Sequence, residues 1–189
     1  VLDPTGSFSP SPESDEAFNR AIESLIDQKG DFEGNYTADE KELLTHYTGW
    51  GGLDVEGTGK GKEALTEFYT PDAIIRKMWA LAYKYGFLNG GKVMEPACGI
   101  GAFLKYVPSD STATGVEMSK YSSSIAKILF PQYNIQHSSF EHYFIKGRDS
   151  IKSRIGDLPK YDLVIGNPPY GDVGGIYMGM GEKQYTKAT

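Results

Sequence analysis

The segment that most constrains the fold of this chain is residues 161–170, which read Tyr-Asp-Leu-Val-Ile-Gly-Asn-Pro-Pro-Tyr. The apolar run 163–165 predicts a short buried strand, and Gly166 follows it. Pro168 and Pro169 fix φ and remove two backbone donors, so neither a helix nor a sheet ladder continues through them. The sequence therefore predicts a stiff polar segment at the C-terminal end of a strand, where open α/β sheets bind their ligands.

The polar groups of this segment suit a planar heterocycle that carries an exocyclic amine. Asn167 offers an amide oxygen, and the carbonyl of Pro168 has no local hydrogen-bond partner. Tyr170 offers a flat aromatic face for stacking. The alternative interpretation is a Pro-rich turn from strand to loop with a purely structural role.

A glycine-rich turn, Glu95-Pro-Ala-Cys-Gly-Ile-Gly-Ala-Phe103, lies between a predicted strand and a predicted helix. Gly99 and Gly101 allow the backbone to turn tightly and to approach a ligand closely. Glu117 follows 22 residues after Glu95, at the end of the next predicted strand. An acid about 20 residues after such a turn is where Rossmann-like sites hold ribose hydroxyls.

Strands alternate with helices from residue 70 onward, which predicts a parallel, doubly wound, Rossmann-like α/β sheet. The expected strands are 92–95, 113–117, 134–137 and 162–165. Three helices are expected between these strands. The first begins at about residue 102, the second follows the strand 113–117 and ends at about residue 130, and the third covers 141–155.

The clearest predicted helix begins with Thr70 as its N-cap and Pro71 as its first residue, and it stops at Gly86. Its apolar residues recur at helical spacing and predict a broad buried face. That face comprises Ile74, Ile75, Met78, Trp79, Leu81 and Ala82.

Charge divides the chain into two parts. Residues 1–57 carry 13 acidic and 3 basic side chains, a net charge of −10, whereas residues 58–189 carry 12 acidic and 16 basic ones, a net charge of +4. We therefore expect an acidic helical extension over 1–57 and a mildly basic core over 58–189. In the extension, a helix over 14–28 should stop at Gly30, and Thr37-Ala-Asp-Glu40 matches a capping box before a second helix.

Composition excludes several other classes of protein. Cys98 is the single cysteine, which rules out an internal disulfide and fits a reducing cytoplasm. The three histidines are scattered, no Cys/His cluster has the spacing of a zinc site, and the apolar runs are too short to span a membrane. We therefore expect a cytoplasmic protein with neither a metal site nor a membrane anchor.

Three segments resemble, in their order, the motifs of DNA adenine-N6 methyltransferases that use S-adenosylmethionine. They are Phe68-Tyr-Thr-Pro71, the glycine-rich turn and the Asn-Pro-Pro-Tyr segment, in the gamma arrangement of that family. The resemblance implies a class I methyltransferase fold and a target adenine that is flipped out of the DNA duplex. Its amine would be held by the Asn-Pro carbonyls and its ring stacked on the tyrosine. The implied catalytic residues are Asn167, Pro168, Pro169 and Tyr170.

The same resemblance assigns the cofactor site. Thr70 and its helix N-terminus would receive the methionine carboxylate, because a helix N-terminus favours an anion. Glu95 would lie near the methionine amino group, Glu117 would bind the ribose, and Phe140 would stack on the adenine. Phe140 follows Ser139, where the family usually has an aspartate that binds the adenine amine. The implied cofactor-binding residues are Tyr69, Thr70, Glu95, Ala97, Gly99, Gly101, Glu117 and Phe140.

Three other functions stay open at this point. DNA cytosine-N4 methylation has a similar amine as its target, and glutamine methylation on a protein uses the same Asn-Pro-Pro-Tyr motif. A degenerate module that binds cofactor or DNA without catalysis is the third, and Ser139 gives it weight. The upstream Phe-Tyr-Thr-Pro and the Glu-Pro-Ala-Cys form of the turn favour DNA adenine.

Only 19 residues follow Tyr170, too few for the three further strands of a complete sheet or for a target-recognition region. We therefore expect an incomplete sheet with poor activity alone, in part of a larger bacterial or phage protein whose DNA contacts lie largely outside this chain. Residues 40–54 also resemble the lead-in of very large methylase–helicase polypeptides from phages and mobile elements.

Overall fold

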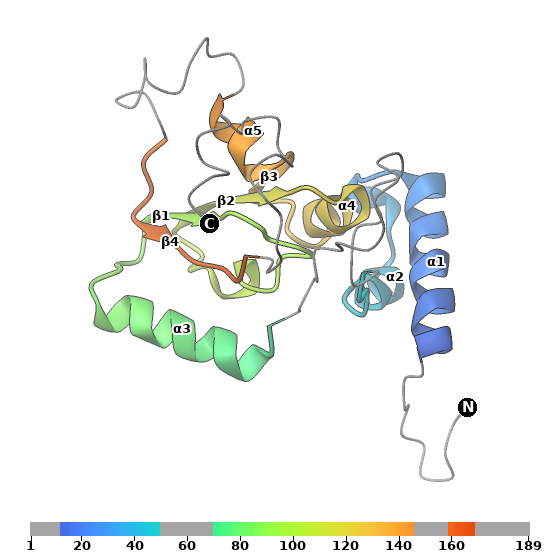
Figure 1. Ribbon diagram of the computed structural model, residues 1–189, viewed down its shortest axis with the longest axis horizontal. Helices are drawn as coiled ribbons and strands as arrows, with labels where there is room; N and C mark the ends of the chain where they lie inside the picture. The colour runs from blue at the N-terminus through green and yellow to red at the C-terminus, as the bar shows by residue number, and fades with distance from the viewer. Residues whose placement is uncertain (1–11, 50–69, 146–158, 169–189) are drawn as a thin grey trace, which may run out of the picture.

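The computed structural model describes residues 12–49, 70–145 and 159–168 of the chain (Figure 1). Within them, four parallel strands form one sheet in the order β3-β2-β1-β4. The parallel α/β sheet is confirmed, and each strand matches its expected range to within one residue. The strands are β1 (Lys92–Glu95), β2 (Thr112–Glu117), β3 (Asn134–His137) and β4 (Leu163–Val164).

The strand order reverses between β1 and β4. The chain passes from β1 outward to β2 and β3, and it then returns to pair β4 with the opposite edge of β1. The amide of Ile165 donates to the carbonyl of Met94 at 3.0 Å, so the pairing continues to the carboxyl ends of both strands. In a doubly wound sheet, such a reversal places a ligand crevice beyond those carboxyl ends.

Helix α3 (Asp72–Lys84) packs against part of the core and runs antiparallel to the strands (Figure 1). Ile75 and Trp79 are buried in one cluster with Val93 of β1, and Trp79 Nε1 donates to the carbonyl of Phe103 at 3.1 Å. A short turn joins the C-terminus of α3 to the start of β1, so the N-terminus of α3 lies toward the carboxyl ends of the strands (Figure 1).

The sequence predicted the C-terminal end of α3 correctly but not its N-cap. Gly86 ends the helix as expected: its φ is +105°, it donates to the carbonyl of Tyr83 at 3.1 Å, and Phe87 donates to that of Ala82 at 3.0 Å. This is a Schellman motif, whose left-handed residue favours glycine. The prediction of Thr70 as N-cap is wrong, because Pro71 is still extended with ψ of 138° and occupies that position without a capping side chain.

The buried face of α3 is narrower than its pattern predicts. Ile75 and Trp79 are buried, and Met78 and Ala82 are partly buried against them. Ile74 and Leu81 keep 48% and 50% of their surface exposed, because they lie at the margins of the apolar stripe. Apolar periodicity marks the direction of the buried face but does not measure how wide a surface the neighbouring strands offer.

The helix expected from residue 102 is wrong. Only a single 3-10 turn, η2 (Leu104–Tyr106), follows the glycine-rich turn. Val107 is extended with ψ of 127°, as expected for a residue that precedes a proline, here Pro108. The proline therefore ends the turn before a regular helix can form.

The remaining core helices agree with the sequence where they are described. Helix α4 (Lys120–Leu129) ends at the expected place, with Phe130 as its C-cap. Helix α5 (Phe140–Ile145) begins near its expected start, and most of the expected continuation to residue 155 lies outside the described residues.

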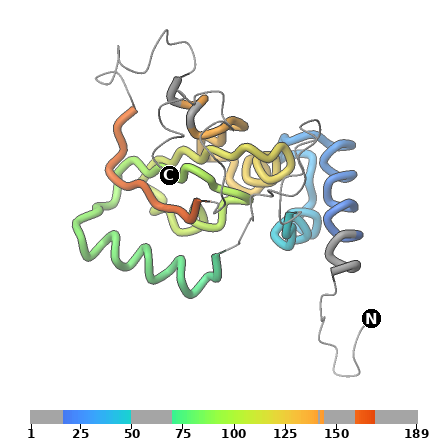
Figure 2. Tube along the Cα trace, in the orientation of Figure 1, coloured from blue at the N-terminus to red at the C-terminus, as the bar shows by residue number. Residues whose placement is uncertain are grey.

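The N-terminal helices pack directly against α4. They are α1 (Pro12–Lys29), the 3-10 turn η1 (Glu33–Asn35) and α2 (Ala38–Leu44). Figures 1 and 2 show α4 between the sheet and these helices. The buried residues Ile22, Ile26, Tyr36, Leu44, Tyr47, Ile125 and Ile128 form one apolar cluster across that contact. The expected boundary between the extension and the core, at residue 57, lies outside the described residues.

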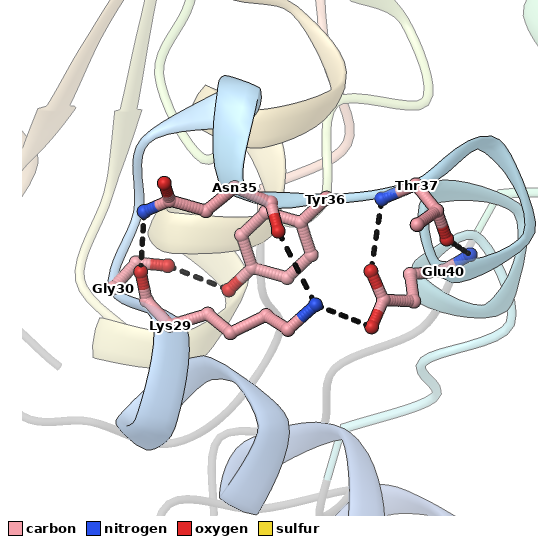
Figure 3. A network of polar contacts seen from close by, with 6 residues as sticks. All are labelled: Lys29, Gly30, Asn35, Tyr36, Thr37 and Glu40. Atoms are coloured by element: carbon pink, nitrogen blue, oxygen red, sulfur yellow. Dashed lines mark hydrogen bonds and ion pairs between the residues drawn. The ribbon is translucent and has the colours of Figure 1, made fainter.

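A polar network holds the N-terminal helices together (Figure 3). Lys29 Nζ donates to Glu40 Oε1 at 2.5 Å and to the carbonyl of Asn35 at 3.2 Å, and it lies over the ring of Tyr36. Thr37 Oγ1 accepts from the amide of Glu40 at 3.2 Å, while Glu40 Oε2 accepts from the amide of Thr37 at 2.8 Å. The predicted capping box is therefore confirmed, and Glu40 connects it to the end of α1.

We expect Thr37→Ala to lower the free energy of unfolding by about 1 kcal/mol, because the substitution leaves a backbone donor of α2 without its cap. Urea denaturation measures the change. Thr45→Ala is the matched control, since Thr45 Oγ1 donates to the carbonyl of Glu42 at the other end of α2. Equal losses for the two variants would contradict a special role for the capping box.

Candidate active site

The glycine-rich turn is tied to the neighbouring strand β2. The amide of Cys98 donates to the carbonyl of Val116 at 3.0 Å, and the amide of Gly101 donates to that of Cys98 at 2.7 Å. Gly101 has φ of +91°, and a Cβ built there would lie 2.6 Å from the ring of Phe130. The absence of a side chain at residue 101 thus lets the turn pack closely against the end of α4.

Glu117 holds two segments at the end of β2. Its Oε2 accepts from the amide of Gly99 at 2.8 Å, and its Oε1 accepts from the amide of Ser119 at 2.7 Å. Burial raises the pKa of this carboxyl, and the hydrogen bonds from Ser119 and Gly99 oppose that shift. The carboxylate thereby positions the glycine-rich turn and the beginning of α4 together. Ser119 is a site residue that the sequence analysis missed, although a serine just before a helical pattern signals an N-cap.

Glu95 is the least satisfied polar group of the site. Only 1% of its surface is exposed, and its Oε2 makes no hydrogen bond within the described part of the chain. Burial raises the pKa of Glu95 well above its ordinary value, and the charge of nearby Glu117 raises it further. A buried carboxyl oxygen without a partner is costly, and it is suited to receive an N–H donor or a cationic amine.

The end of β4 lies directly against Glu95. A Cβ built on Gly166 would be 3.4 Å from Glu95 Cγ and 3.4 Å from Pro96 Cδ, which is ordinary van der Waals contact. Asn167, partly buried, and Pro168, exposed, follow at once. The structure thus brings the glycine-rich turn and the start of the Asn-Pro-Pro-Tyr segment together, whereas Pro169 and Tyr170 lie outside the described residues.

The start of α3 is tied to the residues after the glycine-rich turn. The hydroxyl of Tyr106 in η2 donates to Asp72 Oδ1, and Arg76 Nε donates to Asp72 Oδ2 at 2.7 Å. These hydrogen bonds, the one from Tyr106 first, lower the pKa of Asp72. Thr70 is partly buried two residues before Asp72. Tyr69 lies outside the described residues.

Ser139 lies two residues after the end of β3 and accepts a backbone hydrogen bond at the start of α5. The amide of His142 donates to Ser139 Oγ at 3.2 Å, and His142 Nδ1 lies 3.2 Å from the same oxygen. The hydroxyl of Ser139, where the resemblance leads us to expect an aspartate, is thus engaged at the start of α5. Phe140 follows directly in the chain and is 42% exposed.

Neither a metal site nor a membrane-spanning helix is found among the described residues. None of their His, Cys, Asp and Glu side chains form a group that could hold a metal ion. Across the same residues, no helix is long and apolar enough to cross a membrane.

A family model and two relatives, one from a phage and one from a bacterium, show which known proteins this chain resembles. A family model described as N-6 DNA Methylase matches residues 56–185. The defense against restriction protein B of Escherichia phage P1 is 29% identical over 159 residues, which cover 82% of this chain and 6% of that protein. Type II methyltransferase M.HincII of Haemophilus influenzae is 30% identical over 109 residues, which cover 58% of this chain and 18% of that protein. This chain therefore spans less than a fifth of the length of either relative.

Solved structures include similar folds. The methyltransferase subunit of a type I restriction-modification system from Streptococcus thermophilus is 20% identical and has a TM-score of 0.45. The match covers 75% of this chain and 28% of that chain.

We expect the stability of the chain to fall as pH rises, because Glu95 binds its proton more tightly in the folded state. The loss begins near the unfolded pKa of about 4.3 and continues through the raised folded pKa, at up to about 1.4 kcal/mol for each pH unit. Glu95→Gln should remove this contribution and leave a smaller fall of the same sign from Glu117, whose pKa is also raised. Urea denaturation from pH 5 to pH 8 measures it.

The control for this experiment is Asp110→Asn, which removes an exposed carboxylate at the turn before β2. It should leave the slope of stability against pH unchanged. If Glu95→Gln and the wild-type chain have the same slope, Glu95 does not carry a raised pKa in the folded state.

Proposed function

This chain belongs to the N-6 DNA methylase family, and we propose that it forms the cofactor and catalytic site of an enzyme that methylates the exocyclic N6 amine of adenine in DNA. The methyl donor in this proposal is S-adenosylmethionine. The observation that carries the proposal is the meeting of two segments where the strand order reverses. There, the buried carboxyl of Glu95 lies against Gly166, and Asn167 follows.

The residues present fit S-adenosylmethionine. The unpaired Oε2 of Glu95 suits the amino group of the methionine part, because an ammonium would supply both a donor and an opposite charge. Each oxygen of Glu117 already accepts one backbone N–H but keeps a second lone pair for a ribose hydroxyl. Thr70 and Phe140 would complete the site at the carboxylate and the adenine. When bound, this cofactor supplies an electrophilic methyl group on a sulfonium.

The acceptor side of the proposal rests on Asn167 and Pro168. Their oxygens would accept the two hydrogens of the target amine and favour a more pyramidal, more nucleophilic nitrogen. These residues mainly align the amine, so no strong base is needed beforehand. A base in a duplex is out of reach inside the stack, so it must be flipped outward, where Tyr170 would stack on it.

The family and the relatives support DNA as the substrate class in this proposal. The family model is one of DNA methylases, and one relative is a type II methyltransferase, which favours DNA over a protein acceptor. Adenine is preferred to cytosine because the family is described by N-6 methylation. One relative comes from a phage and another from a bacterium, so we place the activity in the bacterial cytoplasm, where DNA is accessible.

We expect Asn167→Ala in the full-length protein to reduce methyl transfer at least about 100-fold while cofactor affinity changes little, since the amide acts on the acceptor amine. A labelled-methyl assay with DNA and protein acceptors measures the rate. Analysis of the modified nucleosides distinguishes N6-methyladenine from N4-methylcytosine. Asn89→Ala is the control, because Asn89 is exposed in the turn between α3 and β1. A fully active Asn167→Ala variant would remove this residue from the mechanism.

We expect Glu117→Ala to weaken cofactor binding by about 1–3 kcal/mol, because it removes the partner of a ribose hydroxyl and releases the amides of Gly99 and Ser119. Calorimetry with S-adenosylmethionine measures the affinity. Glu117→Gln should lose less, since its amide oxygen keeps one acceptor. Unchanged affinity in both variants would show that Glu117 does not contact the cofactor.

A further inference from the structure

The apolar contact between the N-terminal helices and α4 extends to the glycine-rich turn. Ile100, which lies between the two glycines of that turn, packs against the cluster shared by α1, α2 and α4. Tyr121 in the first turn of α4 packs against the same cluster. The N-terminal helices therefore support two segments that also meet at Glu117.

Two acidic residues of the extension pair with opposite ends of α4. At its first turn, Lys120 Nζ donates to Asp27 Oδ1 at 2.7 Å, and the hydroxyl of Tyr121 donates to Asp27 Oδ2 at 2.9 Å. At its last turn, Lys127 Nζ donates to Asp31 Oδ2 at 2.6 Å. The two aspartates are chemically equivalent, half-exposed and four residues apart, but only Asp27 acts on the turn that follows Glu117.

The N-cap residue of α4 supplies one of the two backbone donors of the Glu117 carboxylate. Ser119 caps α4 by accepting from the amide of Ser122 at 3.3 Å, and its own amide donates to Glu117 Oε1. Lys120 follows directly in the chain. A shift of this turn would therefore move one of the two donors of Glu117, while the other, Gly99, would stay with the glycine-rich turn.

We propose that the acidic N-terminal extension is a working part of the cofactor site, with Asp27 as a positioning residue that acts on Glu117 through the first turn of α4. This inference rests on the proposed function, since it assigns the ribose-binding carboxylate to Glu117. In this proposal, the role of an acidic residue of the extension depends on which end of α4 it contacts. Asp27 tunes cofactor affinity, whereas Asp31 contributes only to the docking of the extension.

The experiment compares charge reversal at the two positions in the full-length protein. Asp27→Lys places a second ammonium beside Lys120, and Asp31→Lys does the same beside Lys127. We expect Asp27→Lys to weaken the binding of S-adenosylmethionine on the order of five-fold and to raise the cofactor KM with kcat unchanged. Asp31→Lys should leave cofactor affinity within about two-fold of the wild type. The two charge reversals should lower the melting temperature by similar amounts.

A rescue variant separates positioning from general damage. Asp27→Lys combined with Lys120→Asp restores an opposite-charge pair, and it should recover most of the lost affinity. Equal cofactor affinities for Asp27→Lys and Asp31→Lys, or a loss that the charge swap does not recover, would overturn the positioning role alone. A wild-type protein that binds no S-adenosylmethionine would overturn the proposed function as well.

Discussion

The rest of this structure depends on the two hydrogen bonds that the Glu117 carboxylate accepts from backbone amides. This carboxylate is buried at the end of β2 and holds the amides of Gly99 and Ser119 on its two oxygens. A buried carboxylate is tolerated when backbone donors surround it, and each of these donors belongs to a segment that must stay in place. One group thereby connects the strand, the glycine-rich turn and the beginning of α4.

The acidic extension strengthens this arrangement from outside. Its apolar residues share a cluster with α4, and Asp27 and Asp31 face Lys120 and Lys127 across the contact. Part of the charge contrast between the two halves of the chain is thus a complementarity between surfaces that touch. Exposed pairs of this kind contribute little to stability, so their value lies more in fixing the orientation of two packed elements than in holding them together.

Local patterns were sufficient wherever the structure depends on neighbouring residues. The capping box of Thr37 and Glu40 and the left-handed glycine at residue 86 are confirmed, because caps and turns are satisfied within a few residues. Local patterns failed at two places, after the glycine-rich turn and at the start of α3. After the glycine-rich turn, Val107 is extended before Pro108 and the chain forms a single 3-10 turn. At the start of α3, Pro71 and not Thr70 is the N-cap.

By itself, the sequence determined the order of the four strands along the chain, the places where they end, and the residue types at those ends. Only the tertiary structure decided which ends meet. The pairing of β4 with β1 places Gly166 against Glu95, and within the described residues one buried oxygen of Glu95 makes no hydrogen bond. The packing of the N-terminal helices joins Ile100 and Tyr121 in one cluster. Hydrophobic periodicity and capping act over a few residues, whereas strand order and burial depend on contacts between distant segments, and no local pattern encodes those distances.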